Sequence, residues 1–159
     1  IKEARHMETD EIVELLAAVD GSSIENLTKF LLGTGVRIGE ALGLRWSDID
    51  LDGPIPIVSI RRSLRTNEGK AVFTDLKTKN SRKVWDKKLK DSSLTDVTFH
   101  TCRHTHASLS LMKGESIFTI SRRLGHSDAA LTMNLYSHLM RDQQSIAATA
   151  MDEFLVKSV

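Results

Sequence analysis

The segment that decides the fold runs from His100 to Tyr136 and reads HTCRHTHASLSLMKGESIFTISRRLGHSDAALTMNLY. It contains a histidine three residues before an arginine, a second histidine that follows Leu-Gly, and a tyrosine ten residues after that histidine. Apolar residues recur in it at helical intervals, and glycines separate the apolar runs. This pattern predicts three helices, over residues 100–113, 116–124 and 128–138.

The rest of the chain predicts a mainly α-helical domain with one small antiparallel β-sheet, an α+β fold. Before residue 45, apolar residues keep a helical spacing, and the runs follow residues that favour a helix N-terminus. Helices are expected to begin at Thr9, at Ser22 or Ser23, and near Arg37. After residue 84 the helical spacing returns, and two further helices are expected over 85–91 and 141–155.

Between these helical regions the apolar spacing changes to the two-residue period of a β-strand. The residues that follow Pro54 alternate in this way, and residues 67–69 are a candidate turn. The segments Ala71–Thr74 and Leu76–Val84 are predicted as further short strands. The small sheet is therefore expected to lie within residues 54–84.

Positive charge is concentrated in the middle of the chain, although the net charge is only +1. Residues 1–52 hold 5 Lys or Arg against 11 Asp or Glu, and residues 91–159 hold 6 against 7. Residues 53–90 hold 11 against 3, which makes a basic block suited to a phosphate backbone. On charge alone, a solvated lysine-rich surface explains this block equally well.

Length and composition exclude several classes of protein. A chain of 159 residues with 40% hydrophobic and 27% charged residues is expected to form one globular domain, residues 1–159. The single cysteine, Cys102, excludes an internal disulfide and fits a reducing cytosol. No apolar run approaches the roughly 18 residues of a membrane span, so no membrane partner is expected. Because the chain begins with Ile1 rather than Met, we expect it to be a fragment of a longer protein.

Two arginines, two histidines and one tyrosine form a set that suits attack on a phosphodiester. Guanidinium groups can hold the nonbridging phosphate oxygens, histidines can bond these oxygens or move protons, and a phenol oxygen can be the nucleophile. Taken singly, each residue has a simpler explanation. Arg37 is explained by an ion pair with Glu40, Arg103 by a surface helix position, and Tyr136, the only tyrosine, by packing.

Four sequence blocks carry a resemblance to a known family. They are TGVRIGEALGLRW (Thr34–Trp46), KTKNSRKV (Lys77–Val84), TFHTCRHTHAS (Thr98–Ser108) and RLGHSDAALTMNLYSH (Arg123–His138). Their order and spacing resemble the catalytic domain of the tyrosine recombinases, the phage integrase family. Any one block is a weak signal, whereas four in the right order are a strong one. The resemblance implies the fold of that catalytic domain, which breaks and rejoins DNA.

The resemblance implies that one set of residues binds and attacks the phosphate. Both arginines would bind its oxygens, the histidines would lie beside them, and the tyrosine would be the nucleophile. This catalytic set comprises Arg37, Lys77, His100, Arg103, His126 and Tyr136. Either His100 or His126 could accept the tyrosine proton, a choice that the sequence leaves open.

The resemblance also implies that a lysine on a β-hairpin donates a proton to the leaving 5′ oxygen. Lys77 is the preferred candidate, and Lys79, on the same strand face, is the alternative. Additional contacts to DNA are expected from basic residues near these blocks, Lys79, Arg82, Arg122 and Arg123.

The implied activity is that of a site-specific DNA recombinase or integrase. Tyrosine attack would form a 3′-phosphotyrosyl intermediate that later reverses, so no metal ion, other cofactor or ATP is expected. Double-stranded DNA is the expected partner, in the cytoplasm of a prokaryotic cell or a phage-infected host. The amphipathic segment Arg141–Val159 is expected to dock on a neighbouring protomer in a tetramer on DNA, and folding back on its own chain is the alternative.

Two features depart from the family pattern. A helical stretch of some tens of residues usually separates the hairpin from the His-x-x-Arg helix, but here only Trp85–Thr98 intervenes. A strand-like run also passes into a helix-like run at Val84–Trp85 without a turn residue. We therefore hypothesise that a segment is missing between these two residues. The N-terminal domain with which the family grips DNA is absent too, which indicates an isolated catalytic fragment.

Three alternative functions remain open from the sequence. Phe118–Tyr136 has the form of a helix-turn-helix, which would make the chain a DNA-binding module without catalysis. A type IB topoisomerase would share the same chemistry. A metal-dependent nuclease or phosphatase could use His100, His104 and His106, but His106 lies off the face that the other two share. His104 is therefore interpreted as a partly buried histidine beside the site.

Overall fold

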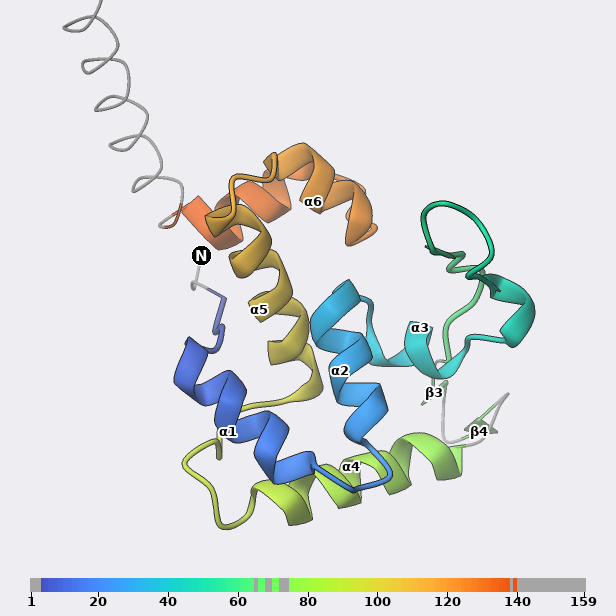
Figure 1. The fold of residues 1–159 in the computed structure, drawn as a ribbon, viewed down its shortest axis with the longest axis vertical. Coiled ribbons are helices and arrows are strands. Elements are labelled where there is room, and N and C mark those ends of the chain that lie inside the picture. Colours follow the sequence, from blue (N-terminus) through green and yellow to red (C-terminus); the bar gives the residue numbers. More distant parts are fainter. Residues whose placement is uncertain (1–3, 65, 68–69, 72–74, 138, 140–159) are drawn as a thin grey trace, which may run out of the picture.

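The computed structural model describes residues 4–64, 66–67, 70–71, 75–137 and 139 of the chain. Helices make up most of this part and pack against one another without a central sheet (Figure 1). They are α1 (Thr9–Val19), α2 (Glu25–Thr34), α3 (Ile38–Leu42), α4 (Asp75–Leu89), α5 (Phe99–Met112) and α6 (Ile117–Arg123), followed by a helical stretch over 129–137. None of the described helices has the length and apolar character that a membrane span requires.

Two small antiparallel sheets accompany the helices, and the predicted α+β class is confirmed. After the short 3-10 helix η1 (Trp46–Asp48), strand β1 (Ile49–Asp50) pairs with β2 (Ile57–Val58). Strand β3 (Thr66–Asn67) pairs with β4 (Lys70–Ala71), so the chain reverses direction where the sequence predicted a turn. The described strands form two separate pairs rather than the one sheet that was expected.

The prediction of a strand over Leu76–Val84 is wrong, because residues 75–89 form the single helix α4. The segment Leu76–Val84 holds three lysines, one arginine and one leucine, all of which favour a helix. Trp85 and Leu89 lie four residues apart and are both buried, so one face of this helix packs on the core. The helix passes unbroken through the Val84–Trp85 junction, which explains why no turn residue stands there. The hypothesis of a missing segment at this junction stays a prediction.

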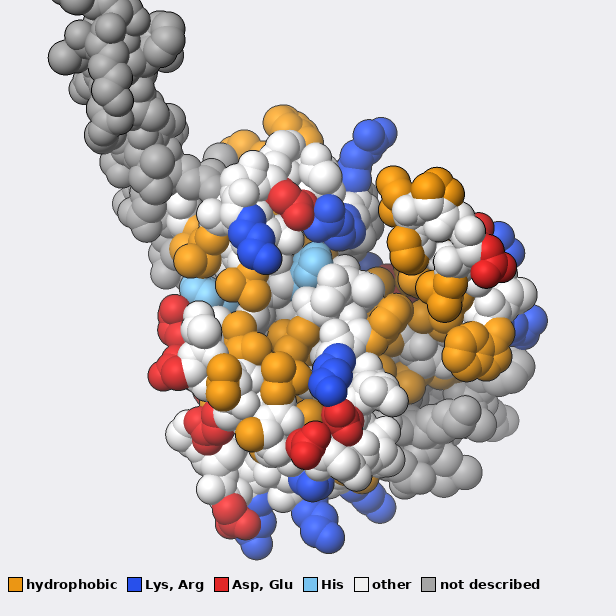
Figure 2. Space-filling model, viewed as in Figure 1, with side chains coloured by type: hydrophobic (Ala, Val, Ile, Leu, Met, Phe, Trp, Pro, Cys, Tyr) orange, Lys and Arg blue, Asp and Glu red, His pale blue; other side chains and the backbone are white. Residues whose placement is uncertain are grey.

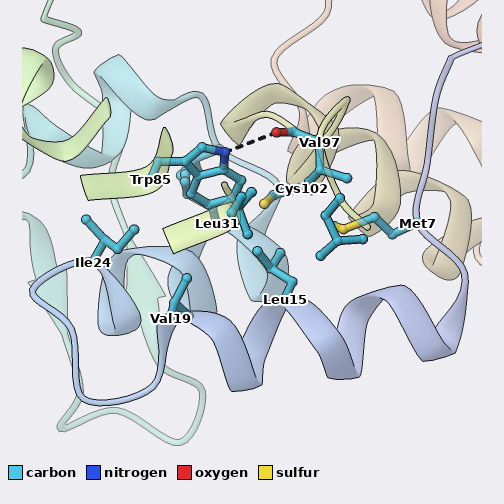
Figure 3. Packing of buried hydrophobic residues seen from close by; sticks show 11 residues of the cluster. Met7, Leu15, Val19, Ile24, Leu31, Trp85, Val97 and Cys102 are labelled. Carbon is cyan, nitrogen blue, oxygen red and sulfur yellow. Dashed lines mark hydrogen bonds between the residues drawn. The ribbon is translucent and has the colours of Figure 1, made fainter. Parts of the chain in front are cut away.

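The larger hydrophobic core lies where α1, α2, α4 and α5 meet (Figure 3). Helix α2 packs against both α5 and α1, and α4 closes the core on the side away from α6 (Figure 1). Burial of these side chains is the main favourable contribution to folding. The core comprises Met7, Leu15, Val19, Ile24, Leu31, Val36, Trp85, Leu89, Leu94, Val97 and Cys102.

Helix α5 is the centre of the domain, because it contributes to two hydrophobic cores. Its Cys102 belongs to the larger core, whereas Ala107 and Leu111 belong to a second core shared with α6 and the stretch 129–137. Arg103 and several small polar residues between these positions are buried as well. The three helices predicted for the deciding segment are therefore confirmed, and the middle of the domain is built around the first of them.

The region around η1 and the first sheet is less well covered. Five large apolar side chains there are more than two-fifths exposed, namely Trp46, Leu51, Ile55, Ile57 and Ile60. Figure 2 shows hydrophobic side chains gathered over this side of the molecule. The helical core is thus closely packed, whereas the sheet region presents an apolar surface.

Replacing Trp85 with phenylalanine tests the packing of α4 on the rest of the core. The Trp85 indole Nε1 donates a hydrogen bond to the Val97 carbonyl at 3.0 Å, and its ring lies 4.2 Å from that of Phe99. Phenylalanine keeps a ring there but leaves a buried carbonyl unpaired. Trp85→Phe should therefore lower the free energy of unfolding by about 1–3 kcal/mol, as measured by urea denaturation.

Trp46→Phe is the matched control, because the Trp46 side chain is 87% exposed. It should change the free energy of unfolding by no more than about 0.5 kcal/mol. Equal losses in the two variants would contradict the placement of Trp85 in the core.

Candidate active site

Arg103 is buried on α5 between the C-terminal ends of two other helices, with 2% of its surface exposed. Its Nη1 donates to the carbonyl of Gly35 at 2.8 Å, and its Nη2 donates to the carbonyl of Leu124 at 2.5 Å. These two residues follow the last residues of α2 and α6. Helix C-termini carry unpaired carbonyls and a partial negative charge, so they stabilise a buried guanidinium. The sequence-based alternative of a surface position for Arg103 is wrong.

Gly35 ends α2 in a conformation that only glycine adopts without strain. Its φ is +69°, in the left-handed region. A Cβ at this position would lie 2.6 Å from Cδ2 of His106 and 2.9 Å from a methyl group of Leu124. The turn therefore brings the end of α2 against both α5 and the end of α6, and it directs the next residues toward α3.

Arg37 caps the N-terminus of α3 and lies at the surface. Its Nη1 pairs with Oε1 of Glu40 at 2.9 Å, and its backbone N–H donates to Oε2 of the same carboxylate at 2.8 Å. The ion pair expected for Arg37 is thus present. Arg37 also lies near Gly125, since a Cβ atom added to Gly125 would be 4.0 Å from Nη1 of Arg37. The pair with Glu40 orients this arginine toward the turn that carries the second histidine of the deciding segment.

A cleft of about 590 Å³ lies between α3, the start of α5 and Gly125. Arg37, His100 and Arg103 all line it. Burial and the nearby charge of Arg37 lower the pKa of Arg103 to about 10. Burial and the two arginines also lower the pKa of His100. Glu40 also lines the cleft, so two guanidinium groups and one carboxylate leave it with a net positive charge. A bound anion would relieve the repulsion between the two arginines.

His126 lies beside this cleft and binds Arg103 directly. Its Nε2 is 2.9 Å from Nη2 of Arg103, and its Nδ1 is 2.7 Å from the hydroxyl oxygen of Thr132. Because a guanidinium only donates, Nε2 must accept and the ring proton must sit on Nδ1. Burial and the neighbouring arginines lower the pKa of His126, which favours this neutral form.

Tyr136 is buried in the second core, with 1% of its surface exposed. Its hydroxyl lies 2.7 Å from Nδ1 of His104, one turn after His100 on α5. Burial raises the pKa of Tyr136 to about 12. Burial and the neighbouring positive groups, His100 first, lower the pKa of His104 to about 4. Both partners of this hydrogen bond are therefore neutral near pH 7.

His104 is the site residue that the sequence analysis placed only beside the site. The predicted proton acceptors were His100 and His126, but the histidine nearest the Tyr136 hydroxyl is His104. The available signal was its position four residues after His100, on the same helix face. The two rings lie 4.6 Å apart, edge to face. In the part of the chain that the structure describes, no three His, Cys, Asp or Glu residues are grouped to hold a metal ion.

The candidate lysines are not on a hairpin. Lys77 and Lys79 belong to α4, because the burial of one face of that segment selects a helix over the predicted strand. Their side chains lie outside the described residues, so the proton-donor role stays a prediction. Of the expected DNA contacts, Arg82 and Arg122 are exposed. Arg123 forms an ion pair with Glu115 at 2.8 Å.

Comparison with known proteins now identifies the family. Residues 5–72 and 58–143 match the model of the phage integrase family in two overlapping parts. The chain belongs to the phage integrase family. It is 28% identical over 171 residues to the ICEBs1 integrase of Bacillus subtilis, which covers 77% of this chain and 46% of the relative. It is 25% identical over 209 residues to a XerC-like tyrosine recombinase of Caldanaerobacter subterraneus, covering 92% and 54%.

Solved structures of integrases and recombinases share this fold. The catalytic domain of bacteriophage HP1 integrase matches with a TM-score of 0.57 and 23% identity, over 86% of this chain and 89% of that one. The XerA recombinase matches with a TM-score of 0.62 and 22% identity, over 92% and 66%. The predicted catalytic-domain fold is thus confirmed. The chain spans about half the length of the curated relatives it matches.

The two arginines of this integrase-family domain should differ in their effect on stability. Lysine at position 103 cannot donate to two carbonyls in fork geometry, so Arg103→Lys should lower the free energy of unfolding by about 2–3 kcal/mol. Arg37→Lys should change it by no more than about 0.5 kcal/mol, because the pair with Glu40 is at the surface. Thermal or urea unfolding of both variants measures the difference. A loss at Arg37 as large as at Arg103 would contradict the structure.

Acid should destabilise the domain through its histidines. The pKa is lowered in the folded state for His100, His104, His106 and His126. Below pH 6.5 the unfolded chain therefore binds more protons than the folded one, and the free energy of unfolding falls as the pH falls toward about 4.

The His104→Gln variant isolates one of these groups. Between pH 6 and 5, the stability of the wild type should fall more steeply than that of His104→Gln, by up to about 1.4 kcal/mol per pH unit. Urea denaturation across this range measures both slopes. Parallel slopes would contradict a neutral, buried His104.

Proposed function

We propose that this chain is the catalytic part of a site-specific DNA recombinase, which cleaves and rejoins double-stranded DNA through a 3′-phosphotyrosyl intermediate. The observation that carries the proposal is the cleft shared by Arg37, His100 and Arg103. Membership of the phage integrase family and the recombinase names of the relatives support it.

The phosphodiester would bind in this cleft. The three hydrogen bonds of Arg103 account for three of the five N–H groups of a guanidinium, which leaves capacity for phosphate oxygens. Arg37 is nearer the surface and its partner Glu40 uses one terminal nitrogen. Together the two arginines would neutralise the charge that develops on the nonbridging oxygens in the transition state. His100, on the cleft wall, would add a hydrogen bond.

The covalent step would exchange one phosphate ester for another. The oxygen of Tyr136 would form a bond to phosphorus while the bond from phosphorus to the 5′ oxygen breaks. The phenol proton would pass to a base, and Lys77 is proposed to supply the proton for the 5′ oxygen. Attack by a 5′ hydroxyl on the phosphotyrosine would reverse the step, so the energy of the broken bond would be conserved without ATP.

The phenol must move before it can react. Tyr136 is buried and is not among the residues that line the cleft. Attack on a phosphate held by Arg37 and Arg103 therefore requires the stretch 129–137 to shift toward the cleft. We take the described arrangement as the resting one.

Double-stranded DNA is the proposed partner. Solved structures similar to this chain include XerH recombinase bound to its difH substrate and the Tn1549 integrase in complex with transposon end DNA. A tetramer on DNA, joined through residues 141–159, is proposed from the amphipathic pattern of that segment, which lies outside the described residues. Action on DNA places the proposed site of activity in the cytoplasm.

The alignments support a segment missing from the interior of the chain. The alignment with the XerC-like recombinase spans 209 residues but covers 92% of this chain, about 146 of its 159 residues. The alignment with the ICEBs1 integrase spans 171 residues and covers 77%, about 122 residues. Both relatives therefore carry positions that have no counterpart here. A segment absent between Val84 and Trp85 would account for them.

A suicide substrate, nicked so that the cleaved strand diffuses away, tests the proposed function. The wild-type chain should form a covalent adduct that mass spectrometry maps to Tyr136, and excess EDTA should not prevent it. Tyr136→Phe should form none. Arg37→Ala should form it about 10²–10³ times more slowly, because one charge-assisted donor is lost while the fold is kept.

Three outcomes would contradict the proposal. DNA binding without any adduct would favour the non-catalytic helix-turn-helix module. Loss of activity in EDTA would favour a metal-dependent nuclease. Relaxation of supercoiled DNA by the chain alone would favour a type IB topoisomerase.

A further inference from the structure

The hydroxyl of Tyr136 is a polar atom placed among apolar side chains. The second core around it contains Ala107, Leu111, Ile120 and Leu124, all buried. A buried hydroxyl without a partner is unfavourable. The hydrogen bond from this hydroxyl to Nδ1 of His104, at 2.7 Å, provides the partner. The burial of this hydroxyl therefore depends on one histidine.

His104 lies behind the cleft wall, between His100 and the phenol. His100 lines the cleft, and the His104 ring packs edge to face behind it at 4.6 Å. His104 and Tyr136 are not among the residues that line the cleft. In the described arrangement the phenol therefore lies outside the cleft in which a phosphate would bind.

We propose that His104 is a positioning residue that holds the Tyr136 phenol in a resting place outside the cleft, and that breaking this hydrogen bond is a step on the way to DNA cleavage. The proposal rests on the proposed function of Tyr136 as the nucleophile. It adds a second residue that controls when this nucleophile is available.

The chemistry of the two groups fits a holding role. A neutral imidazole accepts a hydrogen bond at one nitrogen, and a neutral phenol is a good donor. Both groups are neutral near pH 7, since burial lowers the pKa of His104 to about 4 and raises that of Tyr136 to about 12. The bond therefore favours the protonated phenol, which is the unreactive form. The helical stretch is held at a second point by the bond between Thr132 and His126.

Two variants of His104 distinguish the effect of the hydrogen bond from the effect of the volume that the ring fills. His104→Leu keeps a side chain of similar volume but offers no acceptor. His104→Asn places an amide oxygen or nitrogen near the position of Nδ1 and can restore the bond. Because Tyr136 is the only tyrosine in the chain, nitration by tetranitromethane followed at the nitrotyrosine absorbance reports on this phenol alone.

We expect His104→Leu to be nitrated about tenfold faster than the wild type, the change expected for loss of about one hydrogen bond. Its single-turnover cleavage of the suicide substrate should be at least as fast as that of the wild type. His104→Asn should return both rates to near those of the wild type. Ile120→Ala changes the same core but removes no bond to the phenol. It should raise the nitration rate much less than His104→Leu does when the two variants are compared under conditions of equal unfolding free energy.

Unchanged nitration in His104→Leu, or an equal rise in Ile120→Ala, would overturn the proposal. So would a tenfold fall in the cleavage rate of His104→Leu, because His104 would then act in the chemistry rather than hold the phenol back. Failure of the proposed function is distinguishable from these results. It would leave the wild type without an adduct, whereas nitration needs no activity.

Discussion

The guanidinium of Arg103 lies between the C-terminal ends of α2 and α6 and donates to the carbonyls of Gly35 and Leu124. A cation can be buried there because each helix end presents unpaired carbonyls and the negative end of its dipole. Arg37 follows the first of these carbonyls by two residues, and His126 follows the second by two. One side chain thus sets the relative position of three chain segments that together carry the candidate site.

The same interaction explains the charge of the cleft. Glu40 also lines the cleft, but its carboxylate pairs with Arg37. A carboxylate bonded to Arg103 itself would compensate the buried charge more fully, but it would also repel a phosphate. Backbone carbonyls hold the guanidinium in place and leave much of its positive potential directed at the cleft, where Arg37 adds a second charge. The fold and the affinity for an anion therefore depend on one residue, and a substitution of Arg103 should affect both.

The histidines around this cation act mainly as connectors between helices. A neutral imidazole has one donor and one acceptor, so it can join two different partners. His126 accepts from Arg103 and donates to Thr132, which ties the turn after α6 to the stretch 129–137. His104 binds the hydroxyl of Tyr136 in the same stretch. Burial, together with the nearby positive charges, lowers the pKa of both histidines, keeps them neutral and thereby preserves both links.

The sequence by itself determined the family, the three helices of the deciding segment and the place of Arg37 at a helix start. These features depend on caps, glycine turns and apolar periods that act within a few residues. The strand expected over Leu76–Val84 does not form, and the segment is helical instead. A charged segment has no clear repeat of apolar residues, so the burial of one face decided its conformation. Only the tertiary structure revealed that Arg103 binds two helix ends and that His104 binds Tyr136. Those bonds join residues 21 to 68 positions apart. They exist only once the helices are packed, and no local pattern encodes them.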